Sequence, residues 1–351
     1  MRNARNVTSS DVISQLRLPL IVLVTYAHSY GAIAPGYSIL SCGWDTYEVV
    51  KLLVSQTLVK VAVPVFYIVA GYLFFRRLEQ WSWQTYMGKM RRRVVSLLVP
   101  YVFWNAVVAW KYGAPDWHIL WDYFPQAGIQ TDWFGHEQLL TAPVCLPLWF
   151  LRDLMVVTLL TPIIYICVRG LGHWLMAVLL VFYLSGTCAF VPGLSAYALC
   201  FFTLGAFLAI RREDLLSAAQ RWETPACILT AVLALLMMLT YRTAAFSSLM
   251  LCFRLTGAVA VICVARRLLT VSARRLPPVV CRASYFVYLT HYALFLAFVD
   301  EAFFRMFGTS RAVLCVHYLL CPLVKSALLV AAYCLYQWGR GKLLPTPGKK
   351  G

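Results

Sequence analysis

Long apolar runs separated by short polar segments make up most of the chain, and this pattern predicts membrane-spanning helices. About 20 apolar residues are enough to cross a bilayer as an α-helix. Ten runs approach that length, at residues 12–34, 54–75, 94–110, 148–168, 174–192, 194–210, 226–242, 246–265, 284–304 and 313–337. Val191, Pro192 and Gly193 separate the fifth run from the sixth and predict a tight turn. We therefore expect an all-α, polytopic membrane protein with about ten transmembrane helices.

The composition agrees with a membrane protein. Of the 351 residues, 61% are hydrophobic and 13% are charged, and the mean hydropathy is +0.72. A soluble protein has roughly half apolar and a quarter charged residues, so a soluble cytosolic enzyme, a disordered chain and a disulfide-rich secreted module are excluded. Asp11 and Arg17 stand at the start of the first run, and no small-residue cleavage site follows it. We expect this run to be retained, within a single domain over residues 1–351.

The basic residues predict the orientation in the membrane. A net charge of +17 in a soluble protein would indicate nucleic acid, but here Lys and Arg lie between the apolar runs, so we expect no nucleic-acid partner. With the N-terminus in the cytoplasm, 21 of the 31 Lys and Arg residues fall on the cytoplasmic side, five on the other side and five within runs. Positive charge concentrates in cytoplasmic loops. Both termini are therefore predicted to be cytoplasmic, with a basic tail over 338–351.

The longest loop, about 111–147, is predicted to be external and is rich in aromatic and acidic residues. Its notable side chains are Trp117, Trp121, Asp122, Tyr123, Asp132, Trp133, His136 and Glu137. Aromatic faces stack on sugar rings and carboxylates accept hydrogen bonds from sugar hydroxyls, which suits a saccharide. Trp and Tyr also gather at membrane interfaces without any ligand, so both interpretations stay open.

Most of the twelve cysteines lie inside apolar runs, and the chain has no C-x-x-C pair. Cysteine in such positions behaves as a small hydrophobic residue. Cys42 and Cys145 fall in loops on the same side and could form a bridge. His317 and Cys321 are four residues apart and could bind a metal, but the sequence offers no third ligand. Core packing is the favoured interpretation, and we expect no metal.

Arg17 and His28 are the most informative polar residues within a run. Ionisable groups inside a membrane are costly and indicate function. Their spacing of eleven residues corresponds to three helical turns plus about 20°, so both side chains share one face, roughly 16 Å apart. They could hold two ends of one extended ligand such as an acyl-coenzyme A, with a neutral imidazole taking the proton from an attacking alcohol. Alternatively, Arg17 extends to the interface and His28 bonds a neighbouring helix.

Several segments resemble the acyltransferase-3 family, membrane proteins that O-acylate bacterial glycans and related acceptors. The R-x10-H spacing of Arg17 and His28 resembles the family signature, and segment 64–74 resembles the second span, with Ala70 where serine is usual. Further similar segments are 89–93 with 97–104, 148–154 and 285–291. They follow the family's order along most of the chain, whereas about 170–275 matches only in hydropathy.

The resemblance implies transfer of an acyl group, usually acetyl from acetyl-CoA, to a hydroxyl of a surface glycan or lipid-linked saccharide. His28 would be the catalytic base and Arg17 its partner. Arginines between the second and third runs would dock coenzyme A phosphates through charge-assisted bonds, or they simply mark the cytoplasmic side; they are Arg76, Arg77, Arg91, Arg92 and Arg93. The implied location is the bacterial plasma (inner) membrane. Acyl-CoA would be a substrate, and we expect no tightly bound cofactor.

Four further residues are candidates for substrate binding: Trp149, Arg152, Asp153 and His291. Arg152 and Asp153 are adjacent on a predicted helix and project about 100° apart. We therefore expect each to pair with another helix rather than with its neighbour, in a network that serves either the scaffold or the site. His291 lies on the ninth run and is the last residue of segment 285–291, which resembles the family.

A rival interpretation is a permease or flippase for a lipid-linked saccharide. Its substrate path would use the ionisable residues within runs, namely Arg17, Lys60, Asp153, Arg254 and Lys325. An acyltransferase should release the coenzyme A thiol only when acceptor is present, and a permease should not. A membrane-bound acyltransferase of the other histidine-dependent family is disfavoured, because the similar segments would then be coincidences.

Overall fold

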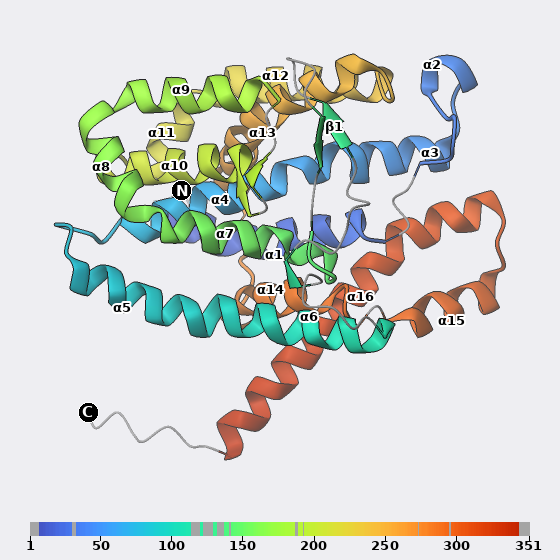
Figure 1. Cartoon of the computed structure of the whole chain (residues 1–351). Helices are drawn as coiled ribbons and strands as arrows, with labels where there is room; N and C mark the ends of the chain where they lie inside the picture. The colour runs from blue at the N-terminus through green and yellow to red at the C-terminus, as the bar shows by residue number, and fades with distance from the viewer. Residues whose placement is uncertain are drawn as a thin grey trace.

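The computed structural model describes residues 7–29, 33–113, 120–121, 129–131, 137–139, 142–186, 189–191, 193–272, 274–294 and 296–343. Its helices are α1 Ser9–Ala27, α2 Ile39–Cys42, α3 Thr46–Lys51, α4 Ala62–Phe75, α5 Trp83–Arg93, α6 Val99–Tyr112, α7 Trp149–Leu159, α8 Thr161–Leu171, α9 His173–Leu184, α10 Ala196–Ile210, α11 Leu215–Gln220, α12 Glu223–Leu239, α13 Ala244–Val271, α14 Pro278–Thr290, α15 Ala297–Phe307 and α16 Arg311–Leu343. Most of the described chain is helical, which confirms the all-α membrane fold (Figure 1).

Two short antiparallel strand pairs interrupt the helices. β1 (Ile129–Thr131) pairs with β2 (Glu137–Leu139), and β3 (Ala189–Val191) pairs with β4 (Leu194–Ser195). The second pair confirms the predicted turn between the fifth and sixth runs. Gly193 has φ +94° there, a conformation that glycine adopts without steric cost.

Five helical segments among the described residues are long and apolar enough to cross a membrane. They are Ser9–Ala27, Thr46–Phe75, Trp83–Lys111, Ala244–Val271 and Arg311–Arg340. A sixth is formed if Leu146–Leu159 and Thr161–Leu171 count as one span bent by 62°, and α9, α10 and α12 are shorter apolar helices. A multi-pass membrane protein is thus supported, while the count of ten spans is not confirmed.

Two predicted runs are not straight helices. The fourth run bends between α7 and α8, where Pro162 lies in the first turn of α8 and cannot donate a backbone hydrogen bond. The ninth run, 284–304, is wrong as one helix, because α14 ends at Thr290 and α15 begins at Ala297. His291 Nδ1 bonds the carbonyls of Tyr288 (2.8 Å) and Val287 (3.2 Å) at the end of α14. Beyond it, α15 turns to lie beside the first part of α16 (Figure 1).

Helices α4 and α10 approach each other at two glycines. A Cβ atom added at Gly71 would lie 2.0 Å from the Phe202 carbonyl oxygen, and one at Gly205 would lie 1.9 Å from the Ile68 carbonyl oxygen. Small residues let membrane helices pack with their backbones in contact. This contact fixes α4, whose opposite end leads into the segment that carries Lys60.

One end of α1 is held by Asp214. This carboxylate accepts a hydrogen bond from Ser9 Oγ (2.7 Å) and caps α11 through the Leu216 and Ser217 backbone N–H groups (both 3.1 Å). Burial opposes ionisation, but the hydrogen bonds from Ser9, Ser217 and Leu216 keep the pKa of Asp214 below its ordinary value. The start of α1, the helix of Arg17 and His28, is thereby tied to the α10–α11 connection.

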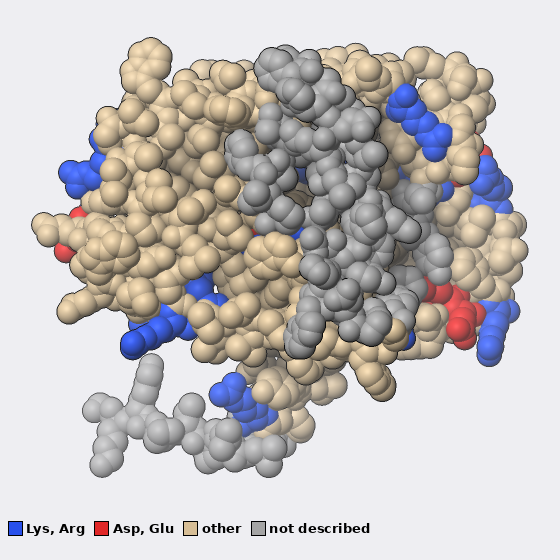
Figure 2. Space-filling model, viewed as in Figure 1, with Lys and Arg blue, Asp and Glu red and all other residues tan. Residues whose placement is uncertain are grey.

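The arrangement gives a helical body with charge at its ends. In Figure 1, α1 passes through the middle of the body, and the α4–α5 and α8–α9 connections lie at the left. The short α2 and the α15–α16 turn lie at the right. In Figure 2 most of the visible described surface is neither acidic nor basic, and Lys and Arg gather mainly toward the ends. An uncharged surface of this kind suits contact with lipid.

Candidate active site

A cavity of about 560 Å³ lies within the helical body, and its walls come from distant parts of the chain. Much of the wall is apolar, with side chains such as Ile21, Val24, Val63, Phe66, Leu151 and Leu154. Helices α1, α4, α7, α13 and α14 all contribute lining residues. The space is within the size range of small-molecule and cofactor sites, roughly 300–1,000 Å³.

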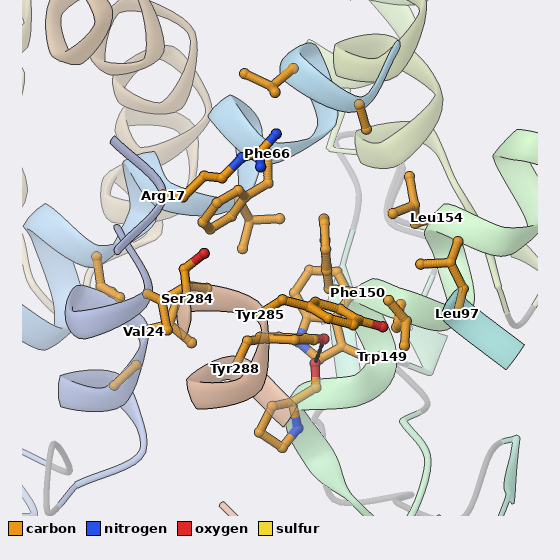
Figure 3. Close-up of a pocket in the computed structure, with 18 of the residues that line it drawn as sticks. Arg17, Val24, Phe66, Leu97, Trp149, Phe150, Leu154, Ser284, Tyr285 and Tyr288 are labelled. Atoms are coloured by element: carbon orange, nitrogen blue, oxygen red, sulfur yellow. Dashed lines mark hydrogen bonds between the residues drawn. The ribbon is translucent and has the colours of Figure 1, made fainter. Parts of the chain in front are cut away.

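Arg17 and His28 both line this cavity. A capping box of Thr8 and Asp11 begins α1, and His28 follows its last residue. The helix therefore presents both side chains on one face, as their spacing predicts. In Figure 3, the guanidinium of Arg17 extends from α1 towards Phe66, across the cavity from Trp149, Tyr285 and Tyr288.

The charged lining of the cavity is entirely basic among the residues that the structure describes. Its cationic members are Arg17, Lys60, Arg93, Arg254 and Arg282, and no described Asp or Glu lines it. Cations in low-dielectric surroundings require compensating negative charge. The composition of the wall therefore fits a ligand with several anionic groups.

Arg17, Arg93 and Arg282 belong to one part of the wall. Cys281, next to Arg282 on α14, interacts electrostatically with Arg17, and Tyr285, one turn further on, interacts with Arg93. The Tyr285 hydroxyl donates to the Ser96 carbonyl at 2.5 Å, which holds α14 against the α5–α6 connection. Three arginines thus line the cavity, and two of them face α14 near the N-terminal half of α1. Guanidinium forks match phosphate geometry bidentately.

His28 lies beside a second histidine at the other part of the wall. The His28 ring is 5.5 Å from the His291 ring and 5.8 Å from the Tyr292 ring, between centroids. His291 is 8% exposed, and its Nδ1 must carry the proton that the Tyr288 and Val287 carbonyls accept. Its Nε2 is buried without a hydrogen-bond partner. In the neutral ring, Nε2 is therefore an acceptor next to His28.

Comparison with known proteins gives the family. The acyltransferase-3 family model, described as an acyltransferase domain, matches residues 12–338. The chain belongs to the acyltransferase-3 family. It is also 28% identical over 163 residues to the succinoglycan biosynthesis protein ExoH of Rhizobium meliloti (strain 1021), a match that covers 44% of this chain and 42% of that relative. No solved structure matches the chain.

The segments that resemble the acyltransferase-3 family meet at the cavity. Trp149 lines it and lies 6.4 Å from the Tyr197 ring, and Tyr285 and Tyr288 come from the segment that ends in His291. His291 contacts His28 but is not part of the cavity lining. The role of each residue in substrate binding stays a prediction.

Arg152 and Asp153 pair with each other, so the prediction that they would bond only other helices is wrong. Arg152 Nη2 lies 3.0 Å from Asp153 Oδ1, because the long arginine side chain folds back towards its neighbour. Both are buried and neither lines the cavity. Asp153 also accepts from Ser195 Oγ (2.8 Å), and Arg152 donates to the Trp121 carbonyl (2.7 Å). The network joins α7 to the β3–β4 hairpin and to the 111–147 loop.

Of the five arginines between the second and third predicted runs, Arg93 lines the cavity and the other four do not. Arg76 lines a separate hollow of about 610 Å³ with Asp214 and Arg266. Arg77, Arg91 and Arg92 are exposed. The arginine directly before the third predicted run therefore faces the cavity, whereas the other arginines of the 76–93 connection do not.

Three cationic residues of the cavity lining were not predicted from the sequence as site residues of an acyltransferase. Lys60 and Arg254 are ionisable residues within apolar runs, which indicates a function. They were considered only as part of the path of the rival transport interpretation. Arg282 looked like one more cytoplasmic arginine. Its place one residue after Cys281 on α14 became informative only once α14 was seen to pack against α1.

A buried ion-pair cluster lies away from the cavity, between α15 and α16. Asp300 accepts from Lys325 Nζ (2.6 Å) and lies 3.0 Å from His317 Nε2. Asp300, His317 and Cys321 offer three potential metal ligands within 4.8 Å of one another, so Asp300 supplies the third ligand that the sequence lacked. However, the Lys325 ammonium already holds this carboxylate, which fits a structural cluster joining the two helices.

The structure describes only part of the 111–147 loop. In the 111–147 loop, Trp117, Asp122, Tyr123, Asp132, Trp133 and His136 lie outside the described residues. The described part includes Trp121 and Glu137, so the choice between a saccharide surface and an aromatic belt stays open. Cys42 is exposed and Cys145 is buried, and both are free thiols.

Proposed function

We propose that this protein is a membrane O-acyltransferase. It would transfer an acyl group, expected to be acetyl, from acyl-CoA to a hydroxyl of a surface glycan or lipid-linked saccharide. The bacterial plasma membrane would be its location, with both termini in the cytoplasm. Membership of the acyltransferase-3 family supports acyl transfer, and the relative named for succinoglycan biosynthesis supports a polysaccharide acceptor.

One observation carries the proposal: His28 and a group of cationic side chains line the same cavity. A coenzyme A thioester has phosphates at one end and the reactive carbonyl at the other. Arg17, Arg93 and Arg282 provide cations near the N-terminal half of α1, and His28 lies about three helical turns further along the helix. An extended donor bound between them would place its thioester near the imidazole.

The reaction follows from these groups. The unprotonated nitrogen of His28 takes the proton of an acceptor hydroxyl as its oxygen attacks the thioester carbon. A C–O bond forms and the carbonyl electron pair moves onto oxygen. When this tetrahedral intermediate collapses, the C–S bond breaks, and the sulfur leaves as a thiolate that takes the proton from the imidazolium. The products are an ester and free coenzyme A. Apolar residues such as Phe66 and Leu151 exclude water, which limits hydrolysis of the thioester.

His291 would support His28 in this scheme. The carbonyls of Tyr288 and Val287 fix its tautomer, so that the buried Nε2 can accept a hydrogen bond from the His28 ring. Trp149 offers an aromatic face in the wall, which suits a sugar ring or the adenine of the donor.

The transport alternative is less well supported. Its path would need Arg17, Lys60, Asp153, Arg254 and Lys325 along one route. Asp153 instead pairs with Arg152, and Lys325 pairs with Asp300 in the cluster between α15 and α16; neither lines the cavity. Three of the five residues remain on the cavity, and these three are all cationic.

The test is acceptor-dependent release of coenzyme A thiol by the purified protein in lipid nanodiscs, together with base-labile acetate on the surface glycans of complemented null cells. His28→Ala should abolish both signals. His173→Ala is the matched control, because His173 is an exposed histidine on α9 outside the cavity. If His28→Ala keeps full activity, the catalytic assignment is wrong. If the wild type moves a saccharide without releasing thiol, the transport alternative replaces the proposal.

A further inference from the structure

Two cationic residues from distant parts of the sequence meet in the wall of the cavity near His28. Lys60 lies just before α4, and Arg254 lies in the middle of α13. Both line the same cavity as His28. The positive charge of Lys60 acts on the His28 ring and on Arg254. The acyltransferase-3 resemblance assigned neither residue a role.

The local backbone explains why Lys60 faces the cavity. The helix before α4 is π-helical over Leu52–Thr57 and 3-10 over Leu58–Val61, so its side chains depart from regular α-helical spacing. Such irregular turns inside helices are frequent at functional sites. This distorted segment contains Lys60 and ends where α4 begins.

A close helix contact brings Arg254 to the same place. A Cβ atom at Gly257 would lie 2.6 Å from Val61 Cγ1, so α13 packs directly on the residue that follows Lys60. Arg254 precedes Gly257 by three residues, about one helical turn, and therefore lies on the same face of α13. Its guanidinium is 4.8 Å from the centre of the Tyr197 ring, which holds it at the cavity wall.

The electrostatics of this corner are unusual for a membrane interior. Two like charges lie close together, and the described lining of the cavity contains no carboxylate. Electrostatic interactions are strong where water is scarce, so negative charge that develops beside this pair is stabilised by both cations. The acyl transfer proposed above creates negative charge beside His28, on the carbonyl oxygen of the thioester.

We propose that Lys60 and Arg254 stabilise the oxyanion of the tetrahedral intermediate formed beside His28. This inference rests on the proposed function. When the acceptor oxygen bonds to the thioester carbon, the electron pair of the C=O bond moves onto the carbonyl oxygen. The two cations then stabilise the negative charge on this oxygen. When the C–S bond breaks, the pair returns to re-form C=O and the interaction weakens. Groups already in place for charge that develops in the transition state lower the barrier without reorganisation.

Loss of either cation is expected to lower kcat. Removing one oxyanion donor typically lowers kcat by about 10²–10³-fold. Lys60→Met keeps the length of the side chain without its charge, so kcat should fall by about that factor while KM for acyl-CoA changes less than about threefold. Lys60→Arg should retain more activity than Lys60→Met. Arg254→Met should lower kcat in the same way. Arg169→Met is the control, since Arg169 is an exposed arginine on α8 outside the cavity.

The measurements are steady-state kinetics of thiol release and the dissociation constant of coenzyme A for each variant, after gel filtration has shown folded protein. A fall in kcat with unchanged coenzyme A binding supports the inference. A rise in KM or in the dissociation constant at constant kcat overturns it, and indicates that the pair binds a permanent anion of the ligand. Unchanged kinetics in both Met variants also overturn it. A wild-type protein without thiol release overturns the proposed function as well, so the two failures are distinguishable.

Discussion

At the scale of single residues, Arg17 should act on donor binding rather than on chemistry. It lines the cavity with Arg93 and Arg282, far from His28 along α1. Hydrogen bonds to charged groups contribute about 1.5–3 kcal/mol, so Arg17→Ala should raise KM for acyl-CoA by roughly 10–100-fold. Because phosphate contacts are the same in the ground and transition states, kcat should stay within about threefold.

Steady-state kinetics at several acyl-CoA concentrations checks this prediction. Arg169→Ala provides the control for loss of an arginine, because Arg169 bonds only the Tyr165 hydroxyl of its own helix among the contacts observed and is exposed. A large fall in kcat without any change in KM would contradict a binding role and would instead place Arg17 at the reacting centre.

What the sequence could predict at this scale depends on helix geometry. The spacing of Arg17 and His28 fixes their common face, because an α-helix has a constant rotation per residue. The prediction that Arg152 and Asp153 do not pair was wrong for a related reason. Their Cβ atoms diverge, but the flexible arginine side chain folds back to its neighbour. Lys60 and Arg254 come from helices that touch where Gly257 packs on Val61, a tertiary contact that has no local signal in the sequence.

At the scale of elements, the contact between α4 and α10 should tolerate no added atom. A Cβ at Gly205 would overlap the Ile68 carbonyl oxygen of α4, and this backbone oxygen cannot rotate away as a flexible side chain can. Gly205→Ala should therefore push the two helices apart and lower the melting temperature of the purified protein by several degrees or abolish its folding, although alanine itself favours helix by about 0.8–1 kcal/mol.

Gly88→Ala is the matched control for this prediction. Gly88 lies inside α5, and a Cβ there would have no atom within 4 Å. This variant should be as stable as the wild type or slightly more stable, since only the helix propensity changes. Thermal unfolding in one detergent, followed by gel filtration, compares both variants. Equal melting temperatures for Gly205→Ala and Gly88→Ala would refute the close contact.

Hydropathy identified the membrane segments but could not identify their breaks. It measures the transfer of side chains from water to an apolar phase, and the apolar sequence continues through Leu160 and through the turn after Thr290. The direction of the chain is set there by Pro162 and by hydrogen bonds from His291. The ion pair of Asp300 with Lys325 then holds α15 against α16. This ion pair joins residues 25 positions apart in the sequence, a contact that a hydropathy window does not register.

At the scale of the whole molecule, the asymmetry of basic residues predicts the orientation in the membrane. Connections that carry many arginines, such as 76–93 and 266–275, lie at the same end of the helical body as the start of α1 (Figure 1). The short α2, which ends in Cys42, and the α15–α16 turn lie at the opposite end, where Arg311 Nη2 is 2.6 Å from Asp45 Oδ2. Because positive charge is retained on the cytoplasmic side, we expect Cys42 to face the periplasm.

Labelling of spheroplasts with a membrane-impermeant maleimide tests this orientation. Cys42 is an exposed free thiol, so the wild type should react, and the reaction should decrease in Cys42→Ser. Ser272→Cys, made in the Cys42→Ser background, adds a thiol at the exposed C-terminal end of α13, beside the basic connection that follows it. It should react only after the membrane is permeabilised. The reverse labelling pattern would show the opposite orientation in the membrane. Arg17, Arg93 and Arg282 would then face away from cytoplasmic acyl-CoA. The orientation experiment therefore also decides whether the cationic part of the cavity can receive its donor from the cytoplasm.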